Sequence, residues 1–200
     1  MEITQYLEEA NNMRKIVLNY FTSEENPEEY YQNLISFLDN KNIKKNKYKL
    51  KEMLHLISKI SDNHQRTKDL FNKIEKILLA LHDEILHNFS NFSIFNIFKH
   101  NKRILLILLE NKLLTINESI ANIMKKGEFK ENNYPIYFFN EIETFLEKDL
   151  RESIQNEIQS INENDSDAFE RNRKIGENDN YICQLIRNDS IEDFIIYVNK

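Results

Sequence analysis

The chain has 200 residues and a formal net charge of −6, so it is long enough for one domain or for an elongated helical array with a substantial core. Two glycines and two prolines are too few for the many turns of a β-sandwich or β-barrel, and the composition therefore predicts an all-α protein. A net charge of this size gives no reason to expect a nucleic-acid partner.

The first two predicted helices lie at the start of the chain. Apolar residues recur at helical spacing over residues 2–21 and trace one broad face. Pro27 can occupy the first position of a second helix because that position needs no N–H donor, and Glu28 and Glu29 favour the positive end of the helix dipole. The second helix is predicted to run to about Leu38.

A lysine-rich connector, Lys41–Lys51, follows the second helix and contains six lysines and one tyrosine. Its candidate contact residues for a nucleic acid or a membrane surface are Lys44, Lys45, Lys47 and Lys49. The segment lacks arginines and several stacking aromatic residues, so it lacks the means to read bases, and a lysine-rich connector is usually just solvated. An adaptor for nucleic acid or a membrane surface is therefore the alternative function, not the main one.

The next two helices are predicted from apolar spacing. A third helix carries apolar residues from Leu50 to Ile60, and residues 61–65 close it. Thr67 is the expected N-cap of a longer fourth helix, whose apolar residues run from Leu70 to Ile85. A helix of this length does not fit an array of short repeats.

A tight helix pair is predicted in the middle of the chain. Its first helix carries Ile94 to Phe98, its second carries Ile104 to Leu109, and residues 100–102 separate them. Phenylalanine recurs every three residues at the start of this pair, a spacing that is typical of core residues. The phenylalanines that we assign to the core are Phe92, Phe95 and Phe98.

The pattern after this pair predicts one well-defined helix and a looser connection. Thr115 and Glu118 have the spacing of a capping box, and Gly127 can supply the left-handed stop of the helix that they begin. Residues 128–135 are predicted as a turn or loop, and Pro135 as the start of a helix to about residue 146. The acidic residues 147–170 are predicted to be a variable or flexible segment.

These elements predict three regions along the chain. Residues 1–127 form a helical N-terminal region, residues 128–172 a variable connecting segment, and residues 173–200 a C-terminal repeat.

Possible metal and cofactor sites are weak in this sequence. Two Glu-x-x-His spacings each place a carboxylate and an imidazole on one helix face, as di-iron bundles require, but such bundles also need a glutamate from each of two further helices. His82 and His87 are five residues apart and so lie about 140° apart around a helix, which does not suit two ligands of one zinc ion. The residues of the two Glu-x-x-His spacings are Glu52, His55, Glu84 and His87.

We therefore predict no metal site, no cofactor and no catalytic residue. Gly127 and Gly176 are far apart in the sequence, which excludes a glycine-rich phosphate loop. Cys183, the one cysteine, is expected to be a small, partly buried side chain.

The sequence predicts an intracellular, cytoplasmic location because Met1-Glu2-Ile3-Thr4 lacks the basic and apolar regions of a secretion signal. No membrane span is expected, since the longest apolar run, Ile104–Leu109, is far shorter than the roughly 20 residues that cross a bilayer.

The C-terminal residues 182–198 predict two short helices folded back on each other. Apolar residues in the first half follow helical spacing, residues 188–190 interrupt it, and a second helical pattern begins at Ile191. Two helices this short bury too little apolar surface to fold alone, so the pair has to stack on neighbouring helices, as in a solenoid. Aligning Ile97 with Leu185 also superimposes Ile107 on Ile195, which suggests an internal repeat.

The same helix pair resembles an ankyrin repeat. Asn188, Ile191, Glu192 and Phe194 match the ankyrin pattern in register or kind, and Asp189 stands at its turn glycine. Taken whole, the chain resembles the N-terminal ankyrin-like helical region of a large family of protist ankyrin-repeat proteins. The segments that carry this resemblance are Leu50–Ser61, Ile94–Glu110 and Arg173–Phe194.

This resemblance implies a non-catalytic scaffold of stacked antiparallel helix pairs that binds another protein. The chain stops at Lys200, where a next repeat would begin, so we expect the last helix to expose an apolar face. That face is the predicted docking site for another protein or for a second copy of the chain. Its residues are Ile191, Phe194, Ile195 and Val198.

Overall fold

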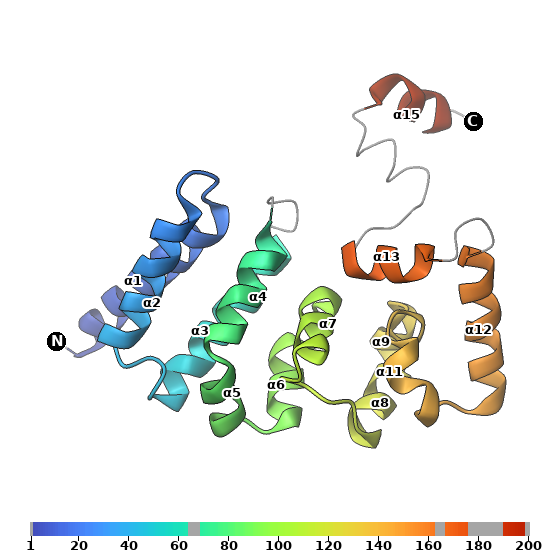
Figure 1. Cartoon of the computed structure of the whole chain (residues 1–200), viewed down its shortest axis with the longest axis horizontal. Helices are drawn as coiled ribbons and strands as arrows, with labels where there is room; N and C mark the ends of the chain where they lie inside the picture. Colours follow the sequence, from blue (N-terminus) through green and yellow to red (C-terminus); the bar gives the residue numbers. More distant parts are fainter. Residues whose placement is uncertain (1, 64–68, 163–166, 176–189, 199–200) are drawn as a thin grey trace. The chain divides into compact units, whose positions relative to one another are not determined.

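The structure is a computed structural model that describes residues 2–63, 69–162, 167–175 and 190–198 (Figure 1). Within these ranges every secondary-structure element is helical and there is no β-strand. The predicted all-α fold class is therefore confirmed. The chain divides into two compact units, Met1–Ile120 and Ala121–Lys200.

The described residues of the first unit form seven helices before α8 (Glu118–Met124), which spans the boundary to the second unit. The seven are α1 (Glu2–Thr22), α2 (Pro27–Asn40), α3 (Lys47–Asn63), α4 (Leu70–Ala80), α5 (His82–Asn88), α6 (Asn91–Phe98) and α7 (Lys102–Glu110).

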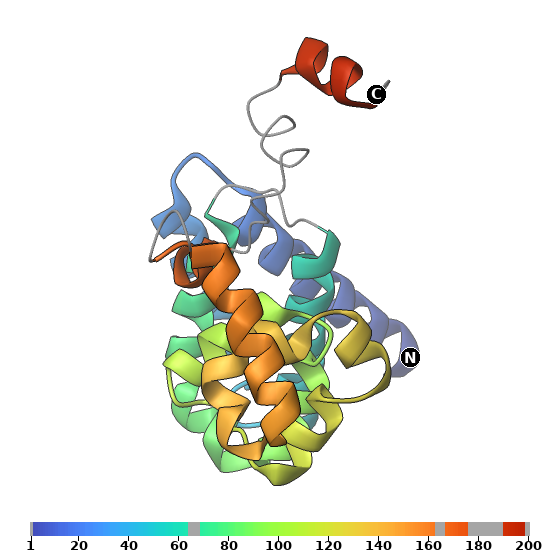
Figure 2. The ribbon, with the colours of Figure 1, turned by 90° about the vertical axis from the view of Figure 1, so that its right-hand side faces the viewer.

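Helices of the first unit pack as successive pairs. α1 contacts α2, α3 contacts α4, and α6 contacts α7. From one pair to the next, α3 contacts α6 and α4 contacts α7, and Figure 1 shows these helices side by side. Figure 2 shows the same ribbon turned by 90°. These contacts form a helical stack, whereas a regular solenoid repeat stays a prediction.

The first two helices follow the predicted pattern. Pro27 is the first residue of α2, as expected. The C-terminal end of α1 receives a cation from α4, because Lys73 Nζ donates hydrogen bonds to the carbonyl oxygens of Phe21 (3.3 Å) and Ser23. A cation at this position stabilises carbonyl groups that have no partner inside the helix.

Two helices of the first unit end in the same backbone motif. After α2, the N–H of Asn42 bonds to the carbonyl of Asp39 and the N–H of Ile43 bonds to that of Leu38, at 3.0 and 2.9 Å. After α7, Lys112 and Leu113 repeat this pattern with the carbonyls of Leu109 and Leu108, at 3.1 and 2.8 Å. Both are Schellman motifs, with Asn42 and Lys112 in the left-handed conformation at φ 52° and 58°.

The start of α3 corrects the predicted connector. α3 begins at Lys47, so only residues 41–46 connect it to α2. The missed signal is Asn46, whose Oδ1 accepts hydrogen bonds from the N–H groups of Tyr48 (3.0 Å) and Lys49 (3.2 Å) and so caps the helix.

The predicted long fourth helix is wrong, because the helix breaks at Leu81 into α4 and α5. The N–H of Leu81 bonds to both Ile77 and Leu78, which tightens the last turn of α4. Leu81, at the break, and Ile85, within α5, are both fully buried. Thr67, the predicted cap, lies outside the described residues.

The assignment of three phenylalanines to the core is correct for two of them. Phe95 and Phe98 are fully buried, but the side chain of Phe92 is 44% exposed. A spacing of three residues turns by about 60° at each step around a helix, so one end of the series leaves the buried face.

The predicted capping box before α8 is also wrong. Asn117 Oδ1 accepts the N–H of Ile120 at 3.0 Å, so Asn117 caps this helix. Thr115 instead pairs with Asn91: its N–H donates to Asn91 Oδ1 at 2.9 Å, and Asn91 Nδ2 donates to its carbonyl. Gly127 has the predicted left-handed backbone, at φ 50°.

The second unit is more ordered than the sequence pattern suggests. Residues 128–135, predicted as a loop, lie largely in two short helices, and the helix predicted from Pro135 is broken into short pieces. The acidic segment 147–170 contains a 15-residue helix rather than a flexible chain. The elements are α9 (Gly127–Glu131), α10 (Tyr134–Tyr137), α11 (Phe139–Ile142), the 3₁₀ turn η1 (Glu143–Phe145), α12 (Lys148–Asn162), α13 (Ala168–Ile175) and α15 (Ile191–Val198).

The unit boundary lies within α8, a few residues before the predicted boundary at 127/128. The predicted boundary at 172/173 falls inside α13, which contacts α12.

Candidate functional site

The predicted docking face lies on α15, and the structure exposes the part of it that can be described. The side chains of Ile191 and Ile195 are 63% and 52% exposed. The helix begins at Ile191 and ends at Val198, as the apolar spacing predicts. The side chains of Phe194 and Val198 lie outside the described residues.

Sequence reasoning missed Ile196 as a member of this surface. Its side chain is 57% exposed, as much as its neighbours. It lies about 100° around the helix from Ile195, and the spacing i, i+3, i+4, i+7 therefore does not include it. Only the exposure of its side chain reveals it.

The partner helix predicted before α15 cannot be compared with the structure. Ile182, Cys183, Leu185 and Asn188 all lie outside the described residues. The helix pair, the ankyrin-like turn and the internal repeat therefore stay predictions.

The candidate basic residues at 41–51 are partly neutralised by acidic neighbours. Lys44 Nζ lies 2.8 Å from Asp39 Oδ1, and Lys49 Nζ lies 2.6 Å from Glu9 Oε1. Lys47 Nζ lies 5.9 Å from the centre of the Phe89 ring.

Lys45 is exposed. The structure thus brings two of the four candidate lysines into ion pairs within the first unit, which reduces the positive charge available to a nucleic acid or a membrane surface. Binding through this segment remains a prediction.

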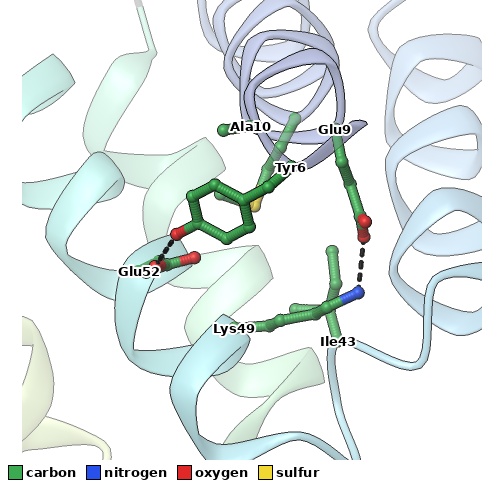
Figure 3. A pocket seen from close by; sticks show the side chains of 7 residues that line it. Tyr6, Glu9, Ala10, Ile43, Lys49 and Glu52 are labelled. Carbon is green, nitrogen blue, oxygen red and sulfur yellow. Dashed lines mark hydrogen bonds and ion pairs between the residues drawn. The ribbon is translucent and has the colours of Figure 1, made fainter. Parts of the chain in front are cut away.

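A small hollow lies between α1 and α3 (Figure 3). Its apolar lining comes from Ala10, Met13 and Ile43, and polar side chains from α1 and α3 meet across it in two pairs. One pair is Lys49 with Glu9, and the other is the Tyr6 hydroxyl, which donates to Glu52 Oε1.

The hollow is too small for a substrate. Its volume of about 20 Å³ is enough for roughly one water molecule. The hydrogen bond to Glu52 is the main cause of a raised pKa at Tyr6, and burial and the charges of Glu52 and Glu9 add to it. A raised pKa keeps the phenol protonated, so Tyr6 acts here as a hydrogen-bond donor that holds α1 to α3.

The two Glu-x-x-His spacings do not come together in a metal centre. In the described parts of the chain, no group of three or more His, Cys, Asp or Glu side chains is arranged to hold a metal ion. Glu52 is bonded to Tyr6, while His55 and His87 are exposed.

A buried polar cluster links α3 to the turn between α6 and α7. Asn101 Nδ2 donates to Ser61 Oγ (2.9 Å) and to Asp62 Oδ1 (3.0 Å), and Asn101 Oδ1 accepts the N–H of Ile104 (3.0 Å). Ser61 Oγ in turn donates to the carbonyl of Ser58 at 2.7 Å. Because these groups bond to one another, the cluster is a structural one.

The second unit contains a buried arginine that the sequence pattern did not single out. Arg173 on α13 forms two hydrogen bonds with the carboxylate of Glu141, at 2.6 and 3.0 Å. The Tyr137 hydroxyl donates to the carbonyl of Arg173 at 2.7 Å, and Arg173 Nη1 donates to the carbonyl of Tyr137 at 3.2 Å. Such a bidentate pair holds α13 on the α10–α11 segment.

Comparison with known proteins adds no family to these observations. No protein-family model, curated protein or solved structure matches this chain. In the described residues, every helix is too short or too polar to cross a lipid bilayer. The resemblance to ankyrin-repeat proteins stays a prediction.

Proposed function

We propose that the chain is a non-catalytic scaffold of ankyrin-like helical type that binds another protein, and that α15 carries the docking face. The observation that supports this most directly is the exposure of Ile191, Ile195 and Ile196 on one eight-residue helix. Apolar side chains in contact with water favour burial, and a cluster of them on a surface is typical of a protein-interaction site.

Burial of these three side chains would supply part of the free energy of binding. Moving a fully exposed isoleucine side chain out of water contributes about 1.5–3 kcal/mol, and these three side chains retain more than half of their exposure. Their burial alone does not offset the cost of association, which is estimated at 4–15 kcal/mol or more. Further contacts therefore have to accompany α15 in the complex.

The proposal is tested by making the face polar. We expect Ile191→Gln combined with Ile195→Gln to lower the amount of a stoichiometric protein partner retained on tagged full-length chain by at least about tenfold, equivalent to about 1.4 kcal/mol. The measurement is quantitative mass spectrometry of proteins captured from nuclease-treated lysate at physiological salt.

The matched control is Ile161→Gln. Ile161 lies on α12 and its side chain is 41% exposed, so the control makes the same chemical change on another helix. Equal retention of the partner by all three proteins, or the absence of any stoichiometric protein, would contradict the proposal.

A further inference from the structure

We propose that the first three turns of α1 form a latched arm, residues 2–12, which leaves α3 as a unit while the rest of α1 stays packed. The latch consists of two polar pairs between α1 and α3, Tyr6 with Glu52 and Glu9 with Lys49. This conformational device is independent of the docking function of α15, since all of these residues belong to the first unit.

The buried side chains described in α1 lie in its second half. None of the side chains from Thr4 to Asn12 is buried, and the two large apolar ones, Tyr6 and Leu7, are 51% and 55% exposed. The hydrophobic effect therefore holds the second half of α1 in the core and contributes little to the arm. The buried residues of the second half are Met13, Val17, Tyr20 and Phe21.

The arm is held to α3 by side chains at the rim of the hollow. Figure 3 shows the Tyr6 hydroxyl directed at Glu52 and the carboxylate of Glu9 directed at Lys49. The ion pair stays in contact with water, because the side chains of Lys49 and Glu9 are 33% and 27% exposed. A pair of this kind changes an opening equilibrium by no more than roughly fivefold. Three turns of helix are marginal on their own, so the arm is expected to open more easily than the rest of the first unit.

Opening of the arm changes the surface at the turn between α2 and α3. It uncovers the side of the hollow formed by Met13 and Ile43, which are 8% and 1% exposed while the arm is closed. It also separates Lys49 from Glu9, whereas the hydrogen bond from Lys49 Nζ to the carbonyl of Lys41, at 3.4 Å, does not depend on the arm. The closed arm thus covers apolar side chains and neutralises one of the candidate basic residues.

Hydrogen exchange of the full-length chain, followed for individual amides by NMR, tests the arm. The first four N–H groups of a helix have no acceptor within it, so the informative amides begin at Tyr6. We expect the protection factors of residues 6–12 to agree within about threefold and to be at least about tenfold lower than those of residues 17–22.

Three results of this measurement would overturn the proposal. A steady decrease of protection towards the N-terminus would show ordinary fraying of a helix end. Equal protection in both halves would show that α1 opens as a whole, and no measurable protection in the arm would show that the arm does not close.

The latch is tested by combining Tyr6→Phe with Lys49→Gln. We expect exchange in the arm to become at least about threefold faster and exchange in the second half of α1 to stay unchanged. The matched control combines Tyr48→Phe with Lys51→Gln, the same chemical changes at two exposed positions of α3. Equal acceleration by the control, or none by the latch variant, would contradict the proposal.

Charge reversal separates the ion pair from a general effect of charge near the start of the helix. Glu9→Lys places a second cation beside Lys49 and is expected to speed exchange in the arm at least about threefold more than Glu8→Lys, a change at the neighbouring exposed position. Glu9→Lys combined with Lys49→Glu restores a pair of opposite charges and should return exchange to within about twofold of the unchanged protein. If the combined variant exchanges as fast as Glu9→Lys alone, the ion pair is not part of a latch and the proposal is wrong.

Discussion

The side chain of Asn101 joins the end of α3 to the start of α7. It caps α7 by accepting the N–H of Ile104, and it donates to Ser61 and Asp62 at the end of α3. The residue is buried, at 6% exposure, so water cannot replace these bonds. Asparagine suits this position because its side chain carries both a donor and an acceptor.

We expect Asn101→Ala to destabilise the protein by about 2–4 kcal/mol, because it removes a helix cap and leaves buried polar groups without their partner. The matched control is Ser90→Ala, which removes the cap of α6, where Ser90 Oγ accepts the N–H of Ser93 at an exposed position. The control is expected to cost about 1 kcal/mol. Urea unfolding followed by circular dichroism measures both, and equal losses would show that the buried bonds of Asn101 add nothing.

We expect the phenol of Tyr20 to make the free energy of unfolding fall as the pH becomes alkaline. Burial is the main cause of the strongly raised pKa of its phenol, so the folded state keeps the proton after the unfolded chain begins to release it near the ordinary value of 10.0. The stability linked to Tyr20 is therefore complete below pH 10 and is lost as the pH rises above it, by at most about 1.4 kcal/mol per pH unit.

The substitution Tyr20→Phe removes the titrating group and is expected to make this alkaline loss smaller. The measurement is the free energy of unfolding at several values between pH 8 and pH 11. Tyr48→Phe, at a side chain that is 81% exposed, is the matched control. If the free energy of unfolding of Tyr20→Phe and of the unchanged protein fell in parallel with pH, the alkaline loss of stability would not come from Tyr20.

At the scale of elements, the ends of α2 and α7 show how the turns of the first unit are formed. Both helices end in a Schellman motif, and in both the next residue, Ile43 or Leu113, is buried. Glycine usually occupies the left-handed position because it has no Cβ. This protein places Asn42 at one such position and Lys112 at the other.

Lys112→Gly is expected to stabilise the protein by about 0.5–1 kcal/mol. The left-handed conformation costs an L-residue about 1–2 kcal/mol, and the greater freedom of glycine in the unfolded chain offsets part of the gain. Asn42→Gly is the matched comparison and should gain less, because asparagine adopts this conformation more readily than lysine. A loss of stability for Lys112→Gly in thermal unfolding would contradict this account.

Helices could be predicted from sequence where both their apolar spacing and their ends are marked by residue type. α1, α2, α6 and α7 were predictable because their apolar residues recur at helical spacing and polar residues or Pro27 mark their ends. The break at Leu81 was not, since leucine is a good helix former and the sequence around it, Leu-Ala-Leu-His, contains no glycine or proline. The cap of α8 was misassigned because Thr115 and Asn117 are both good capping residues and only the contact with Asn91 separates them.

At the scale of the whole molecule, long-range polar pairs are the features that sequence pattern could not supply. Glu141 and Arg173 lie in two of the three predicted regions, yet the structure joins them in one buried pair of the second unit. The segment that forms α12 was predicted to be flexible because its sequence is mostly polar, and Ile154 is its buried residue. Of the candidate docking face, the sequence identified Ile191 and Ile195 but not Ile196.

The pairing of Asn91 with Thr115 has a mechanical consequence for the first unit. The side chain of Asn91 bonds to both the N–H and the carbonyl of Thr115, so the two ends of the segment that contains α6 and α7 are tied together. If the chain is pulled from its two ends, tension passes directly from Asn91 to Thr115 while these bonds hold. The backbone of α6 and α7 is then shielded from the load, and it extends only after the tie has opened.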